Sequence, residues 1–545
     1  MDEVLDGNRK SLKDGGIILN LVDDVTTIAT STEKATEMAN AVSKQLEDAN
    51  LPENLSKRIV MNQSSNATVK IGGTYIGPNT AQKIMEATLG LTEQVHRMVQ
   101  VAEKVGVHQA PLRQTILRAC MINLIPAMND KFRRQLWGDM REAAKIFDEA
   151  IFEGICSTLV LSAEDKQQIE QRFWLPLREG GFGFTKFQEI GMAIRLGAIC
   201  GNLLALRGKL ERIGCLKPGD LISEEIPSLI EEFNTKFAVS EDETLAKDLN
   251  LSSRLRRRAH SHMTQRWKDS LDPKDLMLQE KLKSVTSKES NAFLNVVLKN
   301  FYPHWIYDPQ FLEVFRYKAM LRMVPEGMGK CSKCHKHLLD DYGEHFMKCS
   351  QLGRGAPHKA VQTATLRVLH EEFGLDLGLS ATPTPFLSEF RRESPQEHPA
   401  KVGKKEARTQ ADMRIYEQNM NQLTIIDIVT CAMRTPSNLA EVGTTVSEGE
   451  KAKNLVYDQN YVFQGRVKFI PFAIDTHGRW GEAFKKFVEE LCLRKAEGHQ
   501  HSQLYALAMV NVRRKISIAH ARAVGSRLLI GKQACLKYYD VSMSR

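Results

Sequence analysis

The sequence contains no long apolar run. Across its 545 residues no stretch reaches the roughly 18 consecutive apolar side chains of a membrane-spanning helix, and the N-terminus shows no basic-then-apolar leader. Internal repeats are absent as well. We therefore expect a chain that stays on the cytosolic or nuclear side, with no transmembrane segment and no membrane partner.

A strong excess of one charge is also missing. The net charge of +9 is only a mild bias toward polyanionic partners such as nucleic acid. With 42% hydrophobic and 26% charged residues, the composition is that of an ordinary globular protein. At roughly 150 residues per domain, the length predicts three or four domains.

The positive charge is concentrated in two segments. Residues 254–267 contain five arginines and no acidic residue, and residues 513–545 contain eight Lys or Arg against one acidic residue. Such runs bind phosphates in many proteins, but they also form ordinary solvated helix faces. The residues that we predict to contact nucleic acid are Arg254, Arg256, Arg257, Arg258, Arg513, Arg514 and Lys515.

Three of the ten cysteines lie within nineteen residues, and the other seven are scattered. The pattern C-x2-C-x10-H-x3-C is made by Cys331, Cys334, His345 and Cys349. Thiolates and imidazole are the ligands of tetrahedral zinc, so we predict a closed, structural Zn²⁺ site. His335 and His337 are competing ligands, and reduced cysteines in a loop are the alternative.

Two aspartates, Asp23 and Asp24, stand side by side between apolar, β-branched runs in ILNLVDDVTTIA. A hairpin tip of this kind brings two carboxylates together, and a bound cation offsets their repulsion. Phosphoryl-transfer enzymes use such pairs to hold two magnesium ions. The alternative is a plain turn, in which aspartate is common.

The segments that follow favour the metal interpretation. A predicted helix, then LSKRIVMN, then IGGTYIGPN resemble the end of a reverse transcriptase palm. The segments LRQTILRACMINLIPAMNDKF and WLPLREGGFGF are similar to the thumb of non-LTR retrotransposon polymerases. The resemblance implies that Asp23 and Asp24 are metal ligands and that Lys57 lies near the nucleotide phosphates. It also implies that Tyr75 to Gly77 form the primer grip.

That family has a further metal aspartate on an earlier strand, and two-metal catalysis requires it. Residues 1–16 have no room for this strand or for the fingers. We therefore expect the chain to begin within a palm. We also expect it to lack polymerase activity by itself, unless a separate chain supplies the missing half.

A second pair of aspartates lies far along the chain. Asp412 in QADMRI and Asp427 in TIIDIVT each fall in a strand-like segment, fifteen residues apart. A β-meander of that length can bring both carboxylates together as a metal site for phosphodiester cleavage. The alternative is that both are ordinary edge residues.

The segments around this pair resemble the C-terminal end of non-LTR retrotransposon proteins with a restriction-enzyme-like, PD-(D/E)XK endonuclease. The cysteine motif, HKAVQTATLRVL, the two strands, EKAKNLVY and FIPFAIDTHGRWG follow one another as in that family. In the plain nuclease pattern the lysine would stand at Val429, where it is absent. The family's lysine lies on the next helix, which implies Lys453, with Lys451 as second choice and Tyr457 as the matching tyrosine. QADM lacks the family's usual proline but keeps its acid.

Together these segments predict a multidomain protein of α+β and α/β type. We expect a partial reverse transcriptase palm at 1–80, a helical thumb at 81–205 and a helical, basic linker region at 206–325. A CCHC zinc knuckle at 326–356, a restriction-endonuclease-like α/β domain at 357–495 and a basic helical tail at 496–545 complete the chain.

The resemblance implies metal-dependent nicking of DNA for target-primed reverse transcription, in the nucleus. The expected cofactors are structural Zn²⁺ and Mg²⁺, the latter at the nuclease site and at a completed polymerase site. Expected partners are target DNA, element RNA and a separate chain carrying the missing palm and fingers. No small-molecule substrate beyond nucleotides is expected. The alternative is a catalytically dead remnant that binds nucleic acid through its zinc knuckle and basic segments.

Overall fold

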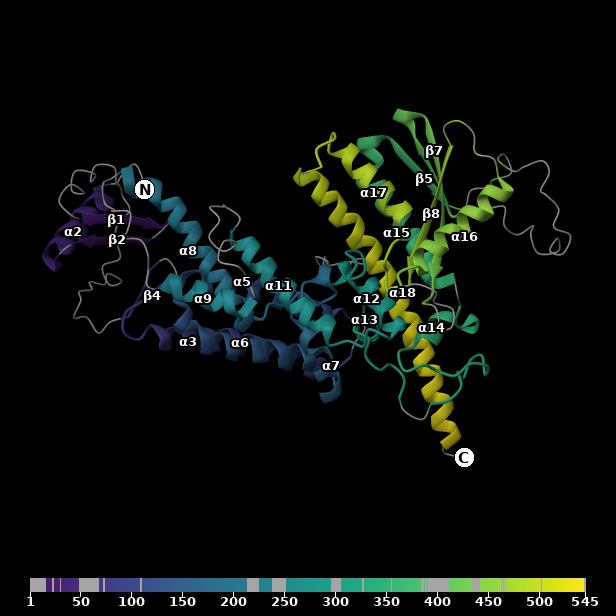
Figure 1. Ribbon diagram of the computed structural model, residues 1–545, viewed down its shortest axis with the longest axis horizontal. Helices are drawn as coiled ribbons and strands as arrows, with labels where there is room; N and C mark the ends of the chain where they lie inside the picture. The colour runs from purple at the N-terminus through teal and green to yellow at the C-terminus, as the bar shows by residue number, and fades with distance from the viewer. Residues whose placement is uncertain are drawn as a thin grey trace. The chain divides into compact units, whose positions relative to one another are not determined.

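The computed structural model consists of two units (Figure 1). One is formed by residues 1–95, 124–151 and 186–259, the other by residues 96–123, 152–185 and 260–545. The structure describes residues 16–21, 24–29, 31–48, 68–71, 74–107, 110–212, 225–237, 251–295, 305–325, 328–353, 355–383, 387, 390, 411–433, 442–461, 463, 465, 467–500 and 502–543. Most of these residues are helical, and the strands form small sheets, so the expected multidomain protein with both helices and sheets is confirmed at this coarse level.

The helices carry most of the described chain. The α-helices are α2 (Thr32–Asp48), α3 (Thr80–Val105), α4 (Leu112–Ala119), α5 (Ile125–Arg134), α6 (Trp137–Thr158), α7 (Ala163–Phe173), α8 (Phe187–Arg212), α9 (Glu225–Phe237), α11 (Leu251–Asp269), α12 (Leu276–Val285), α13 (Asp308–Lys318), α14 (Glu344–Lys348), α15 (Gly355–Leu377), α16 (Thr445–Asn460), α17 (Glu482–Lys495) and α18 (Gln503–Met543). None of the helices in the described ranges combines the length and the apolar character needed to cross a membrane.

The first unit begins with an antiparallel hairpin. Strand β1 (Gly16–Leu21) pairs with β2 (Asp24–Ala29), and Leu21 lies opposite Asp24. Helix α2 follows and buries Met38, Val42 and Leu46. These residues recur at the spacing of one helix face, which is why a helix was the expected structure. The two strands and the helix predicted from the sequence are therefore present.

A second hairpin joins β3 (Val69–Ile71) to β4 (Thr74–Ile76), where the sequence predicts the primer grip. Gly77 follows with a φ of +135°, which a residue with a side chain rarely adopts. Further along the unit, the buried Asp148 carboxylate accepts hydrogen bonds from the amides of Phe187 and Gln188, at 3.0 and 2.9 Å. This contact fixes the beginning of α8, because the first amides of a helix have no partner within it.

The second unit contains a mixed sheet. Its strands are β5 (Leu379–Pro383), β6 (Met413–Glu417), β7 (Gln422–Cys431) and β8 (Val467–Asp475), in that spatial order. Strands β7 and β8 are parallel, and the other neighbours are antiparallel. Helix α16 makes the crossover that two parallel strands require. The sequence reading missed β5, a short strand with polar residues and a proline at its end.

The two faces of this sheet pack against different helices. Helix α16 contacts β7 and β8, and α15 and α17 contact β5 to β8 from the other side (Figure 1). Ile426 and Ile428 of β7 enter the main core with Phe472 of β8, whereas Ile425 packs in a smaller cluster with Tyr457 of α16. Successive residues of a strand point to opposite faces, so this alternation decides which side chains lie beneath α16.

The C-terminal helix α18 belongs to the same domain as the sheet. Ala508, Met509, Val512 and Ile516 are buried in the main core with the strands. The expected domain boundary at residue 495 therefore divides residues that share one core. The basic residues of this segment led to the prediction of a separate tail. The apolar residues that lie among them determine how the helix packs.

Candidate functional site

The second pair of aspartates meets across two neighbouring strands. The antiparallel ladder of β6 and β7 ends with Met413 paired with Ile426, and Asp412 and Asp427 adjoin this last pair. The two carboxyl groups interact, since each affects the pKa of the other. The Asp412 carboxylate also accepts a hydrogen bond from the amide of Ile428 at 2.6 Å, which holds it against β7. The structure thus brings together two acids that are fifteen residues apart in sequence.

The two carboxylates have different electrostatic environments. Burial raises the pKa of Asp427 to about 6, and the neighbouring Asp412 adds to that rise. Burial also acts on Asp412, but its hydrogen bond with His358 and its contact with Asp427 hold the pKa of Asp412 below the ordinary value. The pair therefore combines one strongly ionised carboxylate with one that is costly to ionise, as happens when like charges share a site.

A lysine from the crossover helix completes the cluster. The Nζ atom of Lys453 lies 2.5 Å from Asp427 Oδ2, and its charge opposes the rise in the pKa of that carboxyl. Tyr457, one turn further along α16, is buried, and burial and then the charge of Asp427 raise its pKa. Lys451, the second choice, is exposed on the same helix. Of the two lysines, the structure places Lys453 on the acid.

The position of α16 is itself fixed. Glu450, three residues before Lys453, accepts a hydrogen bond from the amide of Ala483 at 2.9 Å. This amide belongs to the first turn of α17, whose amides have no partner within the helix. Gly481 leaves room for the contact, because a Cβ atom there would lie 2.1 Å from Glu450 Oε1. Glu450 therefore holds α16 with Lys453 over the sheet.

Two polar residues near the start of α15 contact Asp412, and the sequence analysis missed both. His358 Nε2 lies 2.8 Å from Asp412 Oδ1, and Gln362 Nε2 donates to the Asp412 backbone oxygen at 2.6 Å. They are four residues apart, on one face of the helix. The sequence does hold one sign of them. A His and a Gln stand four residues apart near the start of a segment with apolar residues at helical spacing.

The arrangement has the chemistry of a divalent cation site. Two carboxylates supply hard oxygen ligands of the kind that Mg²⁺ prefers, and a bound cation offsets their repulsion. Lys453 supplies a positive charge beside them. The two carboxylates could hold a divalent cation. The lysine that the plain nuclease pattern would place at position 429 has a spatial counterpart on α16.

The cysteine motif forms a second cluster in the same unit. The ligand atoms of Cys331, Cys334, His345 and Cys349 all lie within 4.8 Å of one another. Three sulfurs and one imidazole nitrogen at this separation fit a tetrahedral metal such as Zn²⁺. The predicted clustering of these four residues is present, and they could hold a metal.

Local structure explains how the two ligand pairs meet. Lys330 and Leu338 form a β-bridge around the first pair. Asp340 accepts hydrogen bonds from the amides of Glu344 and His345, at 2.8 and 2.7 Å, and so begins α14 beside the second pair. Gly343 precedes that helix with a φ of +77°.

The competing histidines lie next to this cluster. The ring of His337 is 5.4 Å from that of His345, and the ring of His335 is 5.7 Å from that of Tyr538. His345 Nε2 is 3.4 Å from Cys334 Sγ, within the cluster. Among the described residues, the geometry therefore favours His345 as the nitrogen ligand.

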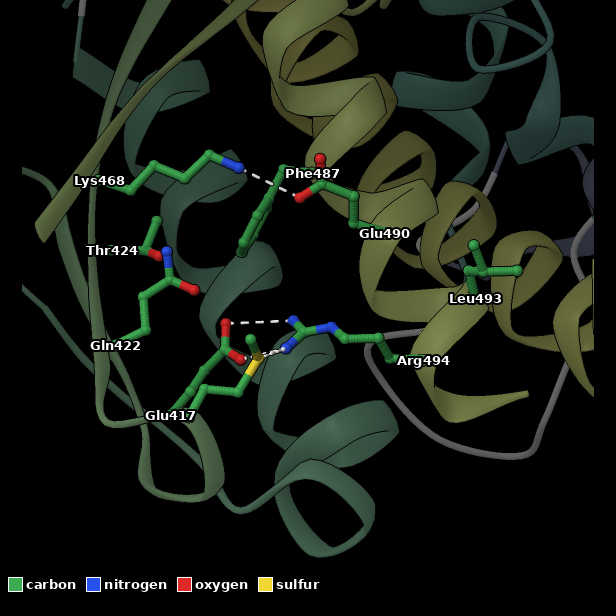
Figure 2. Close-up of a pocket in the computed structure, with 9 residues that line it drawn as sticks. Glu417, Gln422, Thr424, Lys468, Phe487, Glu490, Leu493 and Arg494 are labelled. Carbon is green, nitrogen blue, oxygen red and sulfur yellow. Dashed lines mark hydrogen bonds and ion pairs between the residues drawn. The ribbon is translucent and has the colours of Figure 1, made fainter. Parts of the chain in front are cut away.

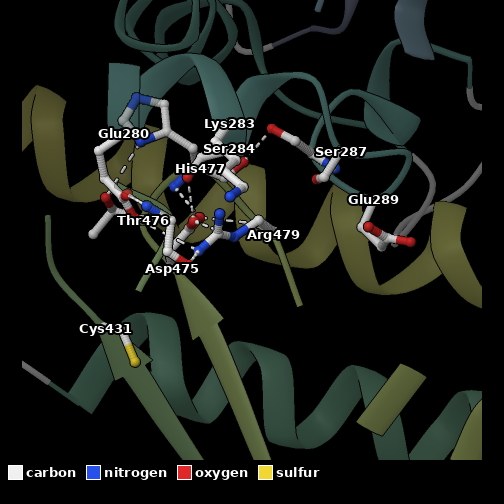
Figure 3. Close-up of polar contacts among 12 residues, drawn as sticks. Glu280, Lys283, Ser284, Ser287, Glu289, Cys431, Asp475, Thr476, His477 and Arg479 are labelled. Carbon is white, nitrogen blue, oxygen red and sulfur yellow. Dashed lines mark hydrogen bonds and ion pairs between the residues drawn. The ribbon is translucent and has the colours of Figure 1, made fainter. Parts of the chain in front are cut away.

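A buried polar network ties β8 to the linker helix α12, and sequence reasoning did not identify it (Figure 3). Asp475 accepts hydrogen bonds from Ser284 Oγ at 2.6 Å and from the amides of His477 and Arg479. Arg479 donates to the backbone oxygen of Gly443 at 3.0 Å, just before α16. The network thus anchors the segment that leads into the lysine-bearing helix.

A separate cavity of about 260 Å³ lies where β6 turns into β7 (Figure 2). Its charged side chains are paired across it: Glu417 with Arg494, and Lys468 with Glu490 at 3.1 Å. Phe487 lies between these pairs. Asp412 and Asp427 do not line this cavity, so it is distinct from the acidic cluster.

The predicted nucleic-acid contacts fall into two groups. On α11, Arg257 and Arg258 are exposed, and Arg254 and Arg256 are half-buried. On α18, Arg513 pairs with Glu289, and Lys515 pairs with Glu371 and Glu372. Burial lowers the pKa of the neighbouring Arg514. The residues of α18 therefore take part in intramolecular contacts that a free basic tail would not make.

The structure describes only some of the residues that the sequence assigns to a polymerase site. Asp23 and Lys57 lie outside the described residues, Asp24 begins β2, and Tyr75 and Gly77 lie in and after β4. The described residues thus show the two hairpins but not a polymerase metal site.

Comparison with known proteins adds no relative. No protein-family model and no curated protein matches the chain.

Proposed function

We propose that the protein is a metal-dependent DNA endonuclease with a structural zinc knuckle. We further propose that it is part of a non-LTR retrotransposon reverse transcriptase–endonuclease. The observation that carries the first proposal is the convergence of Asp412 just before β6, Asp427 of β7 and Lys453 of α16. Two carboxylates can hold a divalent cation, and a lysine beside them can stabilise charge on a scissile phosphate.

Each residue has a defined task in such a reaction. Mg²⁺, when bound, supplies a Lewis acid for the scissile phosphate and lowers the pKa of attacking water. Asp412 and Asp427 hold the cation, and His358 and Gln362 orient Asp412. Lys453 stands where it can stabilise the charge that develops on the phosphate. Hydrolysis breaks one P–O bond and leaves a 3′ hydroxyl and a 5′ phosphate.

The zinc knuckle and the arginines of α11 are proposed to hold nucleic acid, mainly through phosphates. Such binding weakens steeply with salt. The free 3′ hydroxyl would then prime synthesis from element RNA, in the nucleus. The hairpins β1–β2 and β3–β4, separated by α2, have the order of a reverse transcriptase palm, which supports the same origin.

The test is nicking of supercoiled plasmid in Mg²⁺. Wild-type protein should nick it, and Asp427→Asn should reduce the rate by roughly 1,000-fold or more, because one metal ligand is lost. Asp458→Asn, which changes an exposed acid on α16, is the matched control and should retain the wild-type rate. Absence of nicking by folded, zinc-loaded wild type would instead support the catalytically dead nucleic-acid binder.

A further inference from the structure

Helix α18 runs past two separate parts of its unit. Its first half is buried against the sheet, with Val512 and Ile516 in the main core. The second half contacts α13, α14 and the short helix that follows Cys349. Figure 1 shows the helix continuing from beside α15 and α17 to beyond α14. One continuous helix therefore connects the sheet to the Cys331–Cys349 segment, the knuckle.

The key contact is made by Arg527, whose side chain is buried. Its Nε donates to the backbone oxygen of Phe346, its Nη2 to that of Cys349 and its Nη1 to that of Gly353, each at 2.7 Å. All three nitrogens of the guanidinium thus bind backbone oxygens in one short segment. That segment contains Cys349 and begins one residue after His345, the second pair of metal ligands.

Other residues of α18 continue this contact along the knuckle. Gly531 admits Phe346, since a Cβ atom there would lie 2.6 Å from its ring. Cys535 Sγ accepts a hydrogen bond from Ser332 Oγ at 3.4 Å, and Tyr539 Oη donates to the backbone oxygen of Lys330 at 3.0 Å. Residues 527, 531, 535 and 539 recur every four positions and so share one face of the helix. This face contacts the segments of both ligand pairs.

We propose that Arg527 is the positioning residue of the zinc site and that α18 couples zinc retention to the sheet-bearing core. Arginine suits this role because its planar fork binds several acceptors in fixed directions, whereas lysine offers one nitrogen. With the three carbonyls held, Cys349 and His345 keep the geometry that the metal needs. The inference requires zinc in the knuckle but not nuclease activity, so its failure is separate from failure of the proposed function.

The experiment measures release of zinc from the full chain to a chromophoric chelator, well below the unfolding temperature. Arg527→Lys should release zinc roughly 10- to 100-fold faster. Loss of a residue that supports a metal ligand usually weakens metal binding by a factor of this size. Arg522→Lys is the matched control. Arg522 lies on the same helix and also donates to a backbone oxygen, that of Trp305, away from the knuckle. This variant should release zinc within about twofold of wild type.

Equal release from Arg527→Lys and Arg522→Lys would overturn the proposal, as would purified protein that holds no zinc. A second measurement follows backbone hydrogen exchange in α18 before and after chelation. Loss of protection at 524–540, with protection at 506–518 retained, is expected if the metal orders the second half of the helix. Unchanged protection along the whole helix would contradict the coupling.

Discussion

The knuckle and the acidic pair are two clusters of candidate metal ligands, of opposite construction, within one unit. The knuckle gathers four ligands from nineteen consecutive residues, and three of them are thiolates. The acidic pair gathers two carboxylates from neighbouring strands and one lysine from a helix. A closed set of soft ligands holds a metal for structure, whereas a set with few hard ligands leaves positions for water and substrate.

The second difference lies in electrostatic cost. At the acidic pair, burial and repulsion raise the pKa of Asp427, so the folded protein keeps a carboxylate that is unfavourable without a cation. At the knuckle, the side chains of Asp340 and Arg527 bind backbone groups of the segments that carry the ligands, and so hold these segments in place. The acidic pair is therefore expected to lower the stability of the fold in return for activity, and the knuckle is expected to add stability.

The largest expected effect comes from the knuckle. Cys331→Ala removes a fully buried ligand and should abolish binding of one zinc ion per chain. Structural zinc contributes directly to folding, so the free energy of unfolding should fall by several kcal/mol. Bound zinc is measured by metal analysis and stability by denaturant titration.

Asp412→Asn is the control for that variant. It changes the acidic pair and should leave bound zinc unchanged. Loss of zinc in both variants would show that the two sites are not independent, and the contrast between them would fail.

Lys453→Met should lower the nicking rate on the order of 100-fold, because it removes the positive charge beside Asp427. Lys451→Met, on the exposed face of the same helix, should leave the rate unchanged. The two lysines lie two positions apart on α16 and are replaced by the same residue. The two variants should therefore differ little in helix stability. Equal loss in both would remove the specific role of Lys453.

The sequence predicted what local patterns determine. The four ligands of the knuckle are recognisable because short spacing confines them to one small volume. The segments QADMRI and TIIDIVT were predicted to be strand-like, and β6 and β7 are present there.

Long-range contacts were beyond prediction. His358 meets Asp412 only because the N-terminal end of α15 lies beside the beginning of β6, 54 residues later. Arg527 looked like one more charge in a basic tail, yet it is buried 178 residues from Cys349 along the chain. A charged side chain in a sequence gives no sign of the backbone oxygens that will satisfy it, since these depend on tertiary packing.

Asp427→Asn should stabilise the metal-free protein. A carboxyl with a raised pKa binds its proton more tightly in the folded state, so stability falls as pH rises from about 4 to about 6. At pH 7 the full cost is present, and removing the charge should raise the free energy of unfolding by about 3 kcal/mol. Below pH 4 the gain should vanish.

Denaturant titrations at pH 7 and pH 3.8, with EDTA present, measure this difference. Asp458→Asn, at an exposed position, should change stability at neither pH. A destabilised Asp427→Asn at pH 7 would mean that Asp427 is a favourable structural contact, contrary to the contrast drawn between the two sites.

The smallest expected effect concerns His358. Replacement by alanine removes the contact to Asp412 Oδ1 while leaving the amide of Ile428 on Oδ2. Asp412 should then be less well oriented, and the Mg²⁺ concentration for half-maximal nicking should rise about tenfold. The maximal rate at saturating Mg²⁺ should change less, because both carboxylates are still present.

His370→Ala, at an exposed position on the same helix, is the matched control and should leave the Mg²⁺ dependence unchanged. Neither variant should alter bound zinc. A His358→Ala variant that loses maximal rate but keeps the wild-type Mg²⁺ dependence would place His358 in the chemical step rather than in the support of Asp412. The acidic pair would then have an additional catalytic group, while the knuckle's four ligands would be unaffected.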